Sequence, residues 1–312
     1  MKKIIKSLFN VCFLGLSIFL ISGCSSTEKN INENFTEQES FEKTEDTASD
    51  RIDGNYLEVF ELYDYSGYPS FEEAFKDSQL IEHLKKLNQQ LHSKYHYLEI
   101  SLQSSQVIGH YDGDVRFVLD DDESMLNQVV EINGKQTYVT TLKTVTLDQK
   151  VAGILSKYVE NGRSFNSDEY TVVDENIPVI LGSEYADIYS IGDTIQANYL
   201  SLDVCFKIIG FLEEGTQFSI SDQDIVLDYY ICLPAFETNL EMNDQNEKFL
   251  QIYNLQKNCG FIQIEDNCSE DMVEKYRNDV FQLAKENDLY YDAATLQINL
   301  CMIYLNWIFF LF

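Results

Sequence analysis

The sequence is poor in basic residues, histidine and proline. It has 22 Lys and Arg against 52 Asp and Glu, which gives a formal net charge of −30, and only four histidines and three prolines in 312 residues. This shortage of cations argues against nucleic acid as a partner, because phosphate backbones are bound by Lys and Arg. Anionic lipid headgroups are repelled for the same reason. The 20 Tyr, the 20 Phe and the rarity of proline favour a strand-rich, well-packed fold.

Sequence motifs of common enzyme classes are missing as well. Neither a G-x-S-x-G elbow nor a G-x-x-x-x-G-K-[ST] phosphate loop occurs, and Gly134-Lys135 lacks the context of such a loop. His92 and His96 have the spacing of a zinc-binding helix, but no glutamate stands between them. Asp120-Asp121-Asp122 fit a solvated loop better than a calcium site. We therefore expect no enzyme, no cofactor and no metal site.

The N-terminus has the pattern of a secretion signal. Three lysines within the first six residues precede an apolar run from Leu8 to Ile21. The run closes on Leu20-Ile21-Ser22-Gly23-Cys24, which resembles the bacterial lipobox. We expect residues 1–23 to be a lipoprotein signal peptide, Cys24 to carry a diacylglycerol, and the protein to face outside the cytoplasm at the cell membrane. The alternative is an uncleaved first transmembrane helix, for which the apolar run is short.

A polar stretch follows the signal. Ser25 to Asp50 consists mainly of Ser, Thr, Asn, Gln and Glu and contains neither Pro nor Gly. Such a composition cannot bury enough apolar surface to offset the conformational entropy of folding. Residues 24–54 are therefore predicted to be a disordered tether between the lipid anchor and the folded domain.

The cysteines divide into two groups. Cys12 lies in the signal, Cys24 is the expected lipid site, and Cys301 lies in a hydrophobic C-terminal segment. The remaining four lie in the exported domain, where disulfides are permitted: Cys205, Cys232, Cys259 and Cys268. None has C-x-x-C spacing, and their redox state stays open between thiols and disulfides.

Both ends of the domain predict a strand–helix–strand unit. At the first end, an alternating strand over 56–62 is followed by a helix over 71–93, whose start at Ser70 has a capping box, and by a strand over 95–102. At the second end, a strand over 261–264 precedes a helix over 268–287, and a short strand is expected near Tyr290. Asn267 with Glu270 is the expected cap of the second helix.

The middle of the chain predicts mostly strands. The Asn133-Gly134 turn joins the first two in a hairpin. The expected strands cover 128–132, 136–142, 177–181, 193–199, 204–211 and 225–233. The predicted fold class is α+β, in which an α/β subdomain made by both chain ends, 55–110 plus 250–292, carries an inserted β-rich subdomain, 111–249.

One run in the middle resembles a known family. The run contains four motifs: Asn161-Gly162-Arg163-Ser164-Phe165, Ile177-Pro178-Val179-Ile180-Leu181-Gly182, Ile191-Gly192-Asp193-Thr194-Ile195 and Phe206-Lys207-Ile208-Ile209-Gly210-Phe211-Leu212. In this order they resemble the extracytoplasmic core domain of MacB/FtsX-type ABC transporter permeases. The resemblance implies a core domain over 55–292 in which an α/β half is split around a β-rich half. It also implies a domain without catalytic residues.

The residues of this run are expected to serve the fold. Its glycines fit turns and strand ends. Arg163 is expected to pair with Asp168 or Glu169, and Asp193 to cap a turn.

The chain departs from that family at both ends. A lipobox and a tether replace the first transmembrane helix, and the sequence ends shortly after the core. Residues 293–312 hold no charge and are mainly Leu, Ile, Phe, Tyr and Trp. Two interpretations stay open: the start of a second transmembrane helix that is cut short, which the position favours, and a buried closing segment.

These observations predict a non-catalytic extracytoplasmic domain of, or accessory to, an ABC-type export or antimicrobial-peptide permease system. Its expected partners are the membrane, through the lipid anchor and the C-terminal segment, and an ABC permease with a separate ATPase that hydrolyses ATP. The alternatives are a stand-alone ligand-binding lipoprotein and the remnant of a truncated permease.

Overall fold

A computed structural model describes residues 49–51, 55–132, 134–172, 175–220, 223–265 and 268–295. The expected signal peptide with Cys24, the tether before Ser49 and the segment from 296 onward lie outside the described residues.

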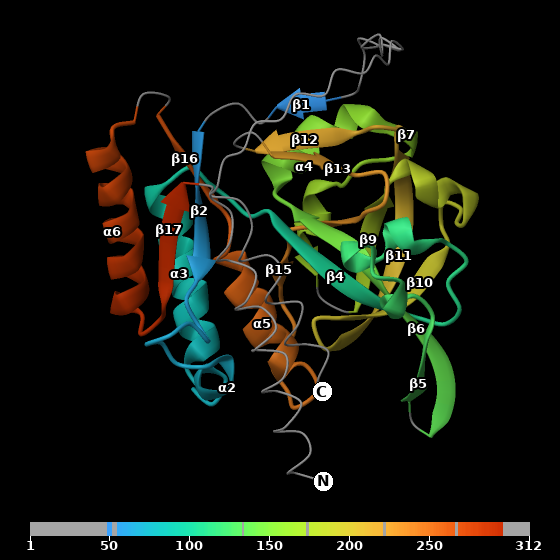
Figure 1. Ribbon diagram of the computed structural model, residues 1–312, viewed down its shortest axis with the longest axis horizontal. Helices are drawn as coiled ribbons and strands as arrows, with labels where there is room; N and C mark the ends of the chain where they lie inside the picture. Colours follow the sequence, from blue (N-terminus) through green and yellow to red (C-terminus); the bar gives the residue numbers. More distant parts are fainter. Residues whose placement is uncertain are drawn as a thin grey trace, which may run out of the picture. The chain divides into compact units, whose positions relative to one another are not determined.

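Both chain ends contribute to one antiparallel sheet in the order β17-β2-β16-β3 (Figure 1). Its strands are β2 (Asn55–Glu61), β3 (Tyr97–Leu98), β16 (Phe261–Ile264) and β17 (Tyr291–Thr295). The helices α3 (Leu80–Lys94) and α6 (Glu270–Glu286) connect these strands in pairs. The resulting βαββαβ order is that of a ferredoxin-like unit. The prediction of an α/β half made by both ends is confirmed.

Hydrophobic spacing explains how the two helices pack. Leu80, Leu84, Leu87 and Leu91 recur on one face of α3, and they share a buried cluster with Val280, Leu283 and Ala284 of α6. Leu57 and Val59 of β2 join the same cluster. The helices and the strands of the two chain ends therefore form a single core.

Helix boundaries differ from the prediction at two places. The segment 71–93 holds two helices, α2 (Phe71–Ala74) and α3, although the predicted capping box of Ser70 with Glu73 is present. Between them, the Asp77 carboxylate accepts a hydrogen bond from the Gln79 backbone at 2.9 Å, and such a local bond competes with helical hydrogen bonding. The cap of α6 is Ser269, which accepts from the Met272 amide, rather than Asn267.

The β-rich half is a closed sheet. Within the described chain, its strands follow the order β10-β4-β6-β14-β9-β11, and β11 pairs back to β10. The bounds are β4 (Ser101–Ile108), β6 (Lys135–Leu147), β9 (Asn176–Leu181), β10 (Thr194–Tyr199), β11 (Leu202–Leu212) and β14 (Ile231–Pro234). Outside this closed path, β5 (Gln128–Ile132) extends β6 as a hairpin and β7 (Val159–Gly162) pairs with β11.

Several shorter elements surround the closed sheet. The helix α4 (Gln149–Leu155) follows β6 directly. The strand pair β8 (Thr171–Val172) and β15 (Glu237–Thr238) and the antiparallel pair β12 (Gln217–Ile220) and β13 (Gln223–Val226) lie nearby. Short 3₁₀ helices cover Val115–Phe117, Leu119–Asp121, Glu123–Met125, Ser156–Tyr158, Ser167–Tyr170 and Ser183–Asp187.

The strand predictions for the middle are right in order and wrong in detail. The predicted single strand over 225–233 is divided into β13 and β14 by a turn in which the Tyr230 amide donates to the Leu227 carbonyl at 3.0 Å. The predicted strand over 95–102 is likewise divided into β3 and β4. Because β4 belongs to the closed sheet, the chain enters the β-rich half at about residue 99 and not at 111.

The domain also extends beyond both of its predicted limits. Ser49–Arg51, placed in the tether by sequence, form β1 in parallel pairing with β12. At the other end, Ala293 is buried within β17, and the strand continues to Thr295. The hydrophobic segment therefore begins inside the fold.

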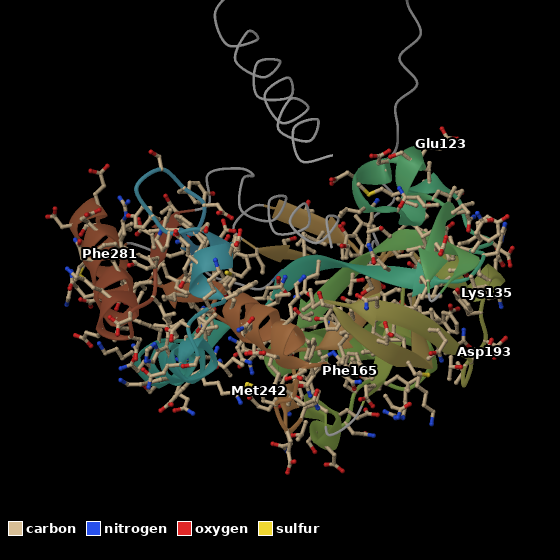
Figure 2. The ribbon with its side chains drawn as sticks, turned by 90° about the horizontal axis from the view of Figure 1, so that it is seen from below. Glu123, Lys135, Phe165, Asp193, Met242 and Phe281 are labelled. Atoms are coloured by element: carbon tan, nitrogen blue, oxygen red, sulfur yellow. The ribbon has the colours of Figure 1, made fainter. Side chains whose placement is uncertain are left out.

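A helix that the sequence did not predict joins the halves. α5 (Glu247–Lys257) lies between them (Figure 1) and is buried along residues 249–257. Phe249, Leu250, Ile252 and Tyr253 belong to the core of the closed sheet, whereas Leu255 belongs to the core of the α/β half. Figure 2 shows Met242, just before α5, between Phe281 of α6 and Lys135 of the hairpin.

Candidate functional site

The two places where the chain crosses between the halves meet at a buried group of polar residues. Glu99 lies on the first crossing, between β3 and β4, and Lys257 is the last residue of α5 on the second crossing. The side chains of Glu99 and Lys257 are only 8% and 6% exposed. Asn88 and His92 reach the same group from α3. We call these four residues the junction cluster.

The Glu99 carboxylate holds the cluster together. Its Oε1 accepts a hydrogen bond from Asn88 Nδ2 at 2.8 Å and lies 2.8 Å from His92 Nε2. Its Oε2 lies 3.5 Å from Lys257 Nζ. Burial alone raises the pKa of Glu99, but the hydrogen bond from His92, the charge of Lys257 and the hydrogen bond from Asn88 outweigh it and lower the pKa below 4.5.

Lys257 ties α5 to both halves. Its ammonium contacts the Glu237 carboxylate and lies 3.5 Å from the Phe236 carbonyl, and both residues precede α5 on the second crossing. Its backbone carbonyl accepts from Tyr97 Oη at 2.9 Å and from Asn88 Nδ2 at 3.0 Å. A buried ammonium with these partners fixes the geometry of the junction, because moving it away would leave Glu99 buried without a counter-charge.

Asp148 adds a second carboxylate near this group. It caps the N-terminus of α4 by accepting from the Lys150 amide at 2.7 Å. Burial, with a smaller contribution from the charge of Glu99, raises the pKa of Asp148 above its ordinary value. The start of α4 and the junction cluster are thus electrostatically linked.

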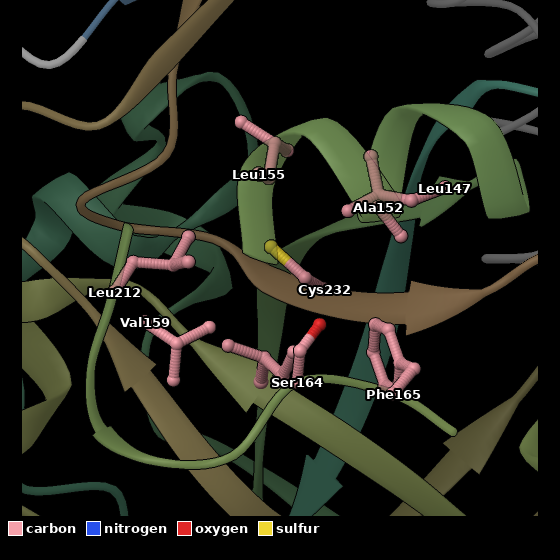
Figure 3. Close-up of a pocket in the computed structure, with 9 residues that line it drawn as sticks. Leu147, Ala152, Leu155, Val159, Ser164, Phe165, Leu212 and Cys232 are labelled. Carbon is pink, nitrogen blue, oxygen red and sulfur yellow. The ribbon is translucent and has the colours of Figure 1, made fainter. Parts of the chain in front are cut away.

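Two small cavities of about 10 Å³ flank this region. The junction cavity is lined by Glu99, Ser101, Gln103, Gln256 and Lys257, among others. The second, which we call the apolar cavity, lies beneath α4 and is lined mostly by aliphatic side chains, with Ser164, Phe165 and Cys232 (Figure 3). Neither has the volume of a small-molecule pocket.

The surface of the β-rich half carries an acidic hollow of about 460 Å³. It is lined by Glu160, Ser183, Glu184, Asp187, Glu213 and Glu214. At its border, Arg116 lies 3.9 Å from Glu184 and pairs more closely with Asp114, at 2.7 Å. The hollow therefore concentrates part of the negative charge of the chain.

The expected site residue Cys24 lies outside the described residues. Of the four cysteines of the domain, Cys205, Cys232 and Cys268 are free thiols, and Cys259 Sγ lies 3.2 Å from Glu61 Oε2 as a thiol donor. Burial raises the pKa of Cys232 to about 12, which makes it a poor nucleophile at neutral pH.

His92 and the aspartate run make contacts with neighbouring side chains. His92 contacts Glu99, and Asp121 accepts from Lys143 Nζ at 2.7 Å. Across the ranges that the structure describes, no group of three or more His, Cys, Asp or Glu side chains could hold a metal ion.

The run from Asn161 to Leu212 forms neighbouring strands of the β-rich sheet, with β11 between β7 and β9 and paired to β10. Arg163 forms a bidentate pair with Glu169 at 2.7 and 2.6 Å, and Asp193 accepts from the Ser190 amide at 2.9 Å, so both expected roles are confirmed. A side chain at Gly182 would meet the Leu227 carbonyl oxygen at 2.0 Å, which explains the glycine there.

Comparison with solved structures gives several likenesses, and one of them is to a transporter domain. The structure is similar to the extracellular domain of the noncanonical ABC-type transporter YknZ from Gram-positive bacteria, with 13% identity and a TM-score of 0.36, over 77% of this chain and 100% of that domain. No protein-family model matches the chain, and no curated protein matches it. Among the described residues, no helix has the length and apolar character needed to cross a bilayer.

Proposed function

We propose that this protein is a non-catalytic extracytoplasmic domain that works with an ABC-type export permease and its separate ATPase. The observation that carries the proposal is the run from Asn161 to Leu212. Its residues resemble those of MacB/FtsX-type permeases, and in the fold they build adjoining strands of the β-rich half. The split of the α/β half around this β-rich half supports the same interpretation.

The construction of the junction suits a domain that passes a displacement from one half to the other. α5 contributes side chains to both cores, and the junction cluster binds its C-terminal residue to both crossings. A movement imposed on the α/β half would therefore act on the closed sheet through a buried helix. Such a domain needs no reactive group.

The attachment to the membrane is part of the proposal. We infer that Cys24 carries the lipid anchor, that residues 1–23 are removed, and that the polar chain after Cys24 serves as a spacer. The uncharged segment after Thr295 is proposed to contact the bilayer or a permease subunit, because its fourteen apolar side chains, counting Cys and Tyr, would expose a large apolar surface if left in water.

The test is made in membranes of the source organism with the full chain carrying an affinity tag. Cells are grown with a fatty-acid analogue, and the tagged chain is isolated in detergent and probed for the analogue and for the ABC permease and ATPase encoded beside it. The chain should carry the label and bring both subunits with it. Cys24→Ser should lose the label, whereas the matched control Cys12→Ser should keep it.

Three outcomes of this experiment separate the alternatives. Label on Cys24→Ser would contradict lipidation at that residue. A labelled chain that isolates without permease or ATPase, or whose gene has no such neighbours, would favour a stand-alone ligand-binding lipoprotein. If an unlabelled chain isolates with the permease and the ATPase, the result would support the association with a transporter and contradict the lipid anchor.

A further inference from the structure

The junction cavity lies where both chain crossings supply polar groups. Glu99 and Ser101 come from the first crossing and the start of β4, and Gln256 and Lys257 come from the end of α5. Its volume of about 10 Å³ is close to the smallest that holds one water molecule. It is therefore a site for a single small species between two segments far apart in sequence.

Three buried atoms around this cavity lack a full set of hydrogen bonds. Gln256 is 4% exposed, and its Oε1 has no hydrogen-bond partner among the described residues. Glu99 Oε2 and Lys257 Nζ are 3.5 Å apart, which is longer than an ordinary N–H···O bond. The Phe236 carbonyl is also 3.5 Å from Lys257 Nζ. A buried amide oxygen without a partner is costly, so a polar occupant is favoured here.

We propose that the junction cavity binds one structural water molecule that completes the junction cluster. The water accepts a hydrogen bond from Lys257 Nζ and donates to Gln256 Oε1 and Glu99 Oε2. Three partners are typical of a buried water. The water thereby joins the first crossing, through Glu99, to the end of α5, through Gln256 and Lys257.

Charge and size argue against other occupants. A cation would meet the Lys257 ammonium and an anion would meet the Glu99 carboxylate, each within a volume that fits only one water. The apolar cavity provides the contrast, because it has the same volume but a mainly aliphatic lining, and such cavities stay dry. Its predicted state is empty.

Diffraction from crystals of the full chain that resolve ordered water gives the direct test. The expected result is a density peak in the junction cavity within hydrogen-bond distance of Gln256 and Lys257, and none in the apolar cavity. An empty junction cavity in such a map would overturn the proposal.

The sign of a stability change gives an independent test. Gln256→Met keeps the length of the side chain and replaces both the amide oxygen and the amide nitrogen by apolar groups. If water satisfies that oxygen, the variant loses a hydrogen bond, and the urea midpoint of the full chain should fall by roughly 0.5 M. If the oxygen has no hydrogen-bond partner, its removal relieves the free-energy cost of burying it, and the urea midpoint should rise. A rise would refute the water site.

Thr141→Val is the matched control. Thr141 is buried, its Oγ1 likewise has no partner among the described residues, and it lines neither cavity. Its replacement should leave the midpoint unchanged or raise it. The expected pattern is therefore a lower urea midpoint for Gln256→Met and no lowering of the midpoint for Thr141→Val.

Discussion

The two cavities have the same volume but differ in their linings, since charged and amide side chains line only the junction cavity, and the difference shows what each part of the molecule needs. The apolar cavity lies inside one half, between α4 and the closed sheet, where Leu155 and Cys232 meet mainly aliphatic side chains and one hydroxyl, that of Ser164 (Figure 3). The junction cavity lies where two halves meet, and Glu99, Lys257 and Gln256 line it. Packing within a half requires side chains of complementary shape, whereas packing between the halves also depends on charge and hydrogen-bond geometry.

The largest expected effect comes from breaking the buried pair at the junction. Lys257→Met should lower the free energy of unfolding by about 3–5 kcal/mol, because it leaves Glu99 buried without its counter-charge. Adding Glu99→Gln to this variant should recover part of the loss. Urea unfolding followed by circular dichroism measures both changes.

An exposed pair provides the control for this prediction. Lys76 and Glu72 lie 3.1 Å apart with both side chains well exposed, so Lys76→Met should change stability by less than about 1 kcal/mol. If Lys257→Met were equally mild, the junction cluster would not hold the halves together.

The next effect comes from enlarging the apolar cavity. Leu155 is 2% exposed, and Leu155→Ala should cost about 3 kcal/mol through lost burial and a larger void. The enlarged space should remain dry and take up xenon in pressurised crystals. Ordered water in that space would remove the contrast between the two cavities.

Most of the order of helices and strands along the chain could be predicted from local sequence patterns. The leucines of α3, the alternating strand β2 and the glycine-bounded strands of the middle carry their periodicity in adjacent residues. The α+β class and the split of the α/β half follow from that order. α5 escaped prediction because it is buried on every face along 249–257, which removes the polar stripe that marks a surface helix.

The junction cluster was out of reach for a different reason. Glu99 and Lys257 are charged residues in unremarkable surroundings, and only the antiparallel pairing of β16 with β3 and β2 brings their segments together. The spacing of His92 to His96 resembles that of a metal-binding helix, whereas the fold directs His92 to Glu99. Strand pairing between distant segments determines which residues meet at such a site, and no local sequence pattern predicts that pairing.

The smallest expected effect is a dependence of stability on acid pH that arises at the junction. Because His92, Lys257 and Asn88 together outweigh the effect of burial, the pKa of Glu99 lies below 4.5 in the folded protein. Folding therefore favours the ionised carboxylate, and its contribution is complete above about pH 4.5 and lost as the pH falls through the lowered pKa. Urea midpoints measured across this range should fall less steeply towards acid for Glu99→Gln than for the unchanged chain.

The neighbouring groups sharpen this last prediction. Burial raises the pKa of Asp148 above 3.8, so its contribution has the opposite sign: it favours folding while protonated and is lost as the pH rises. In Asp148→Asn, the loss of stability that Glu99 causes at acid pH should therefore be steeper. Cys232 lines the apolar cavity with a pKa of about 12 and stays neutral throughout, so Cys232→Ala should lower stability by a constant amount and leave the shape of the profile unchanged. Parallel profiles for Glu99→Gln and the unchanged chain would mean that the junction does not favour the ionised carboxylate, and the electrostatic difference between the two cavities would be lost.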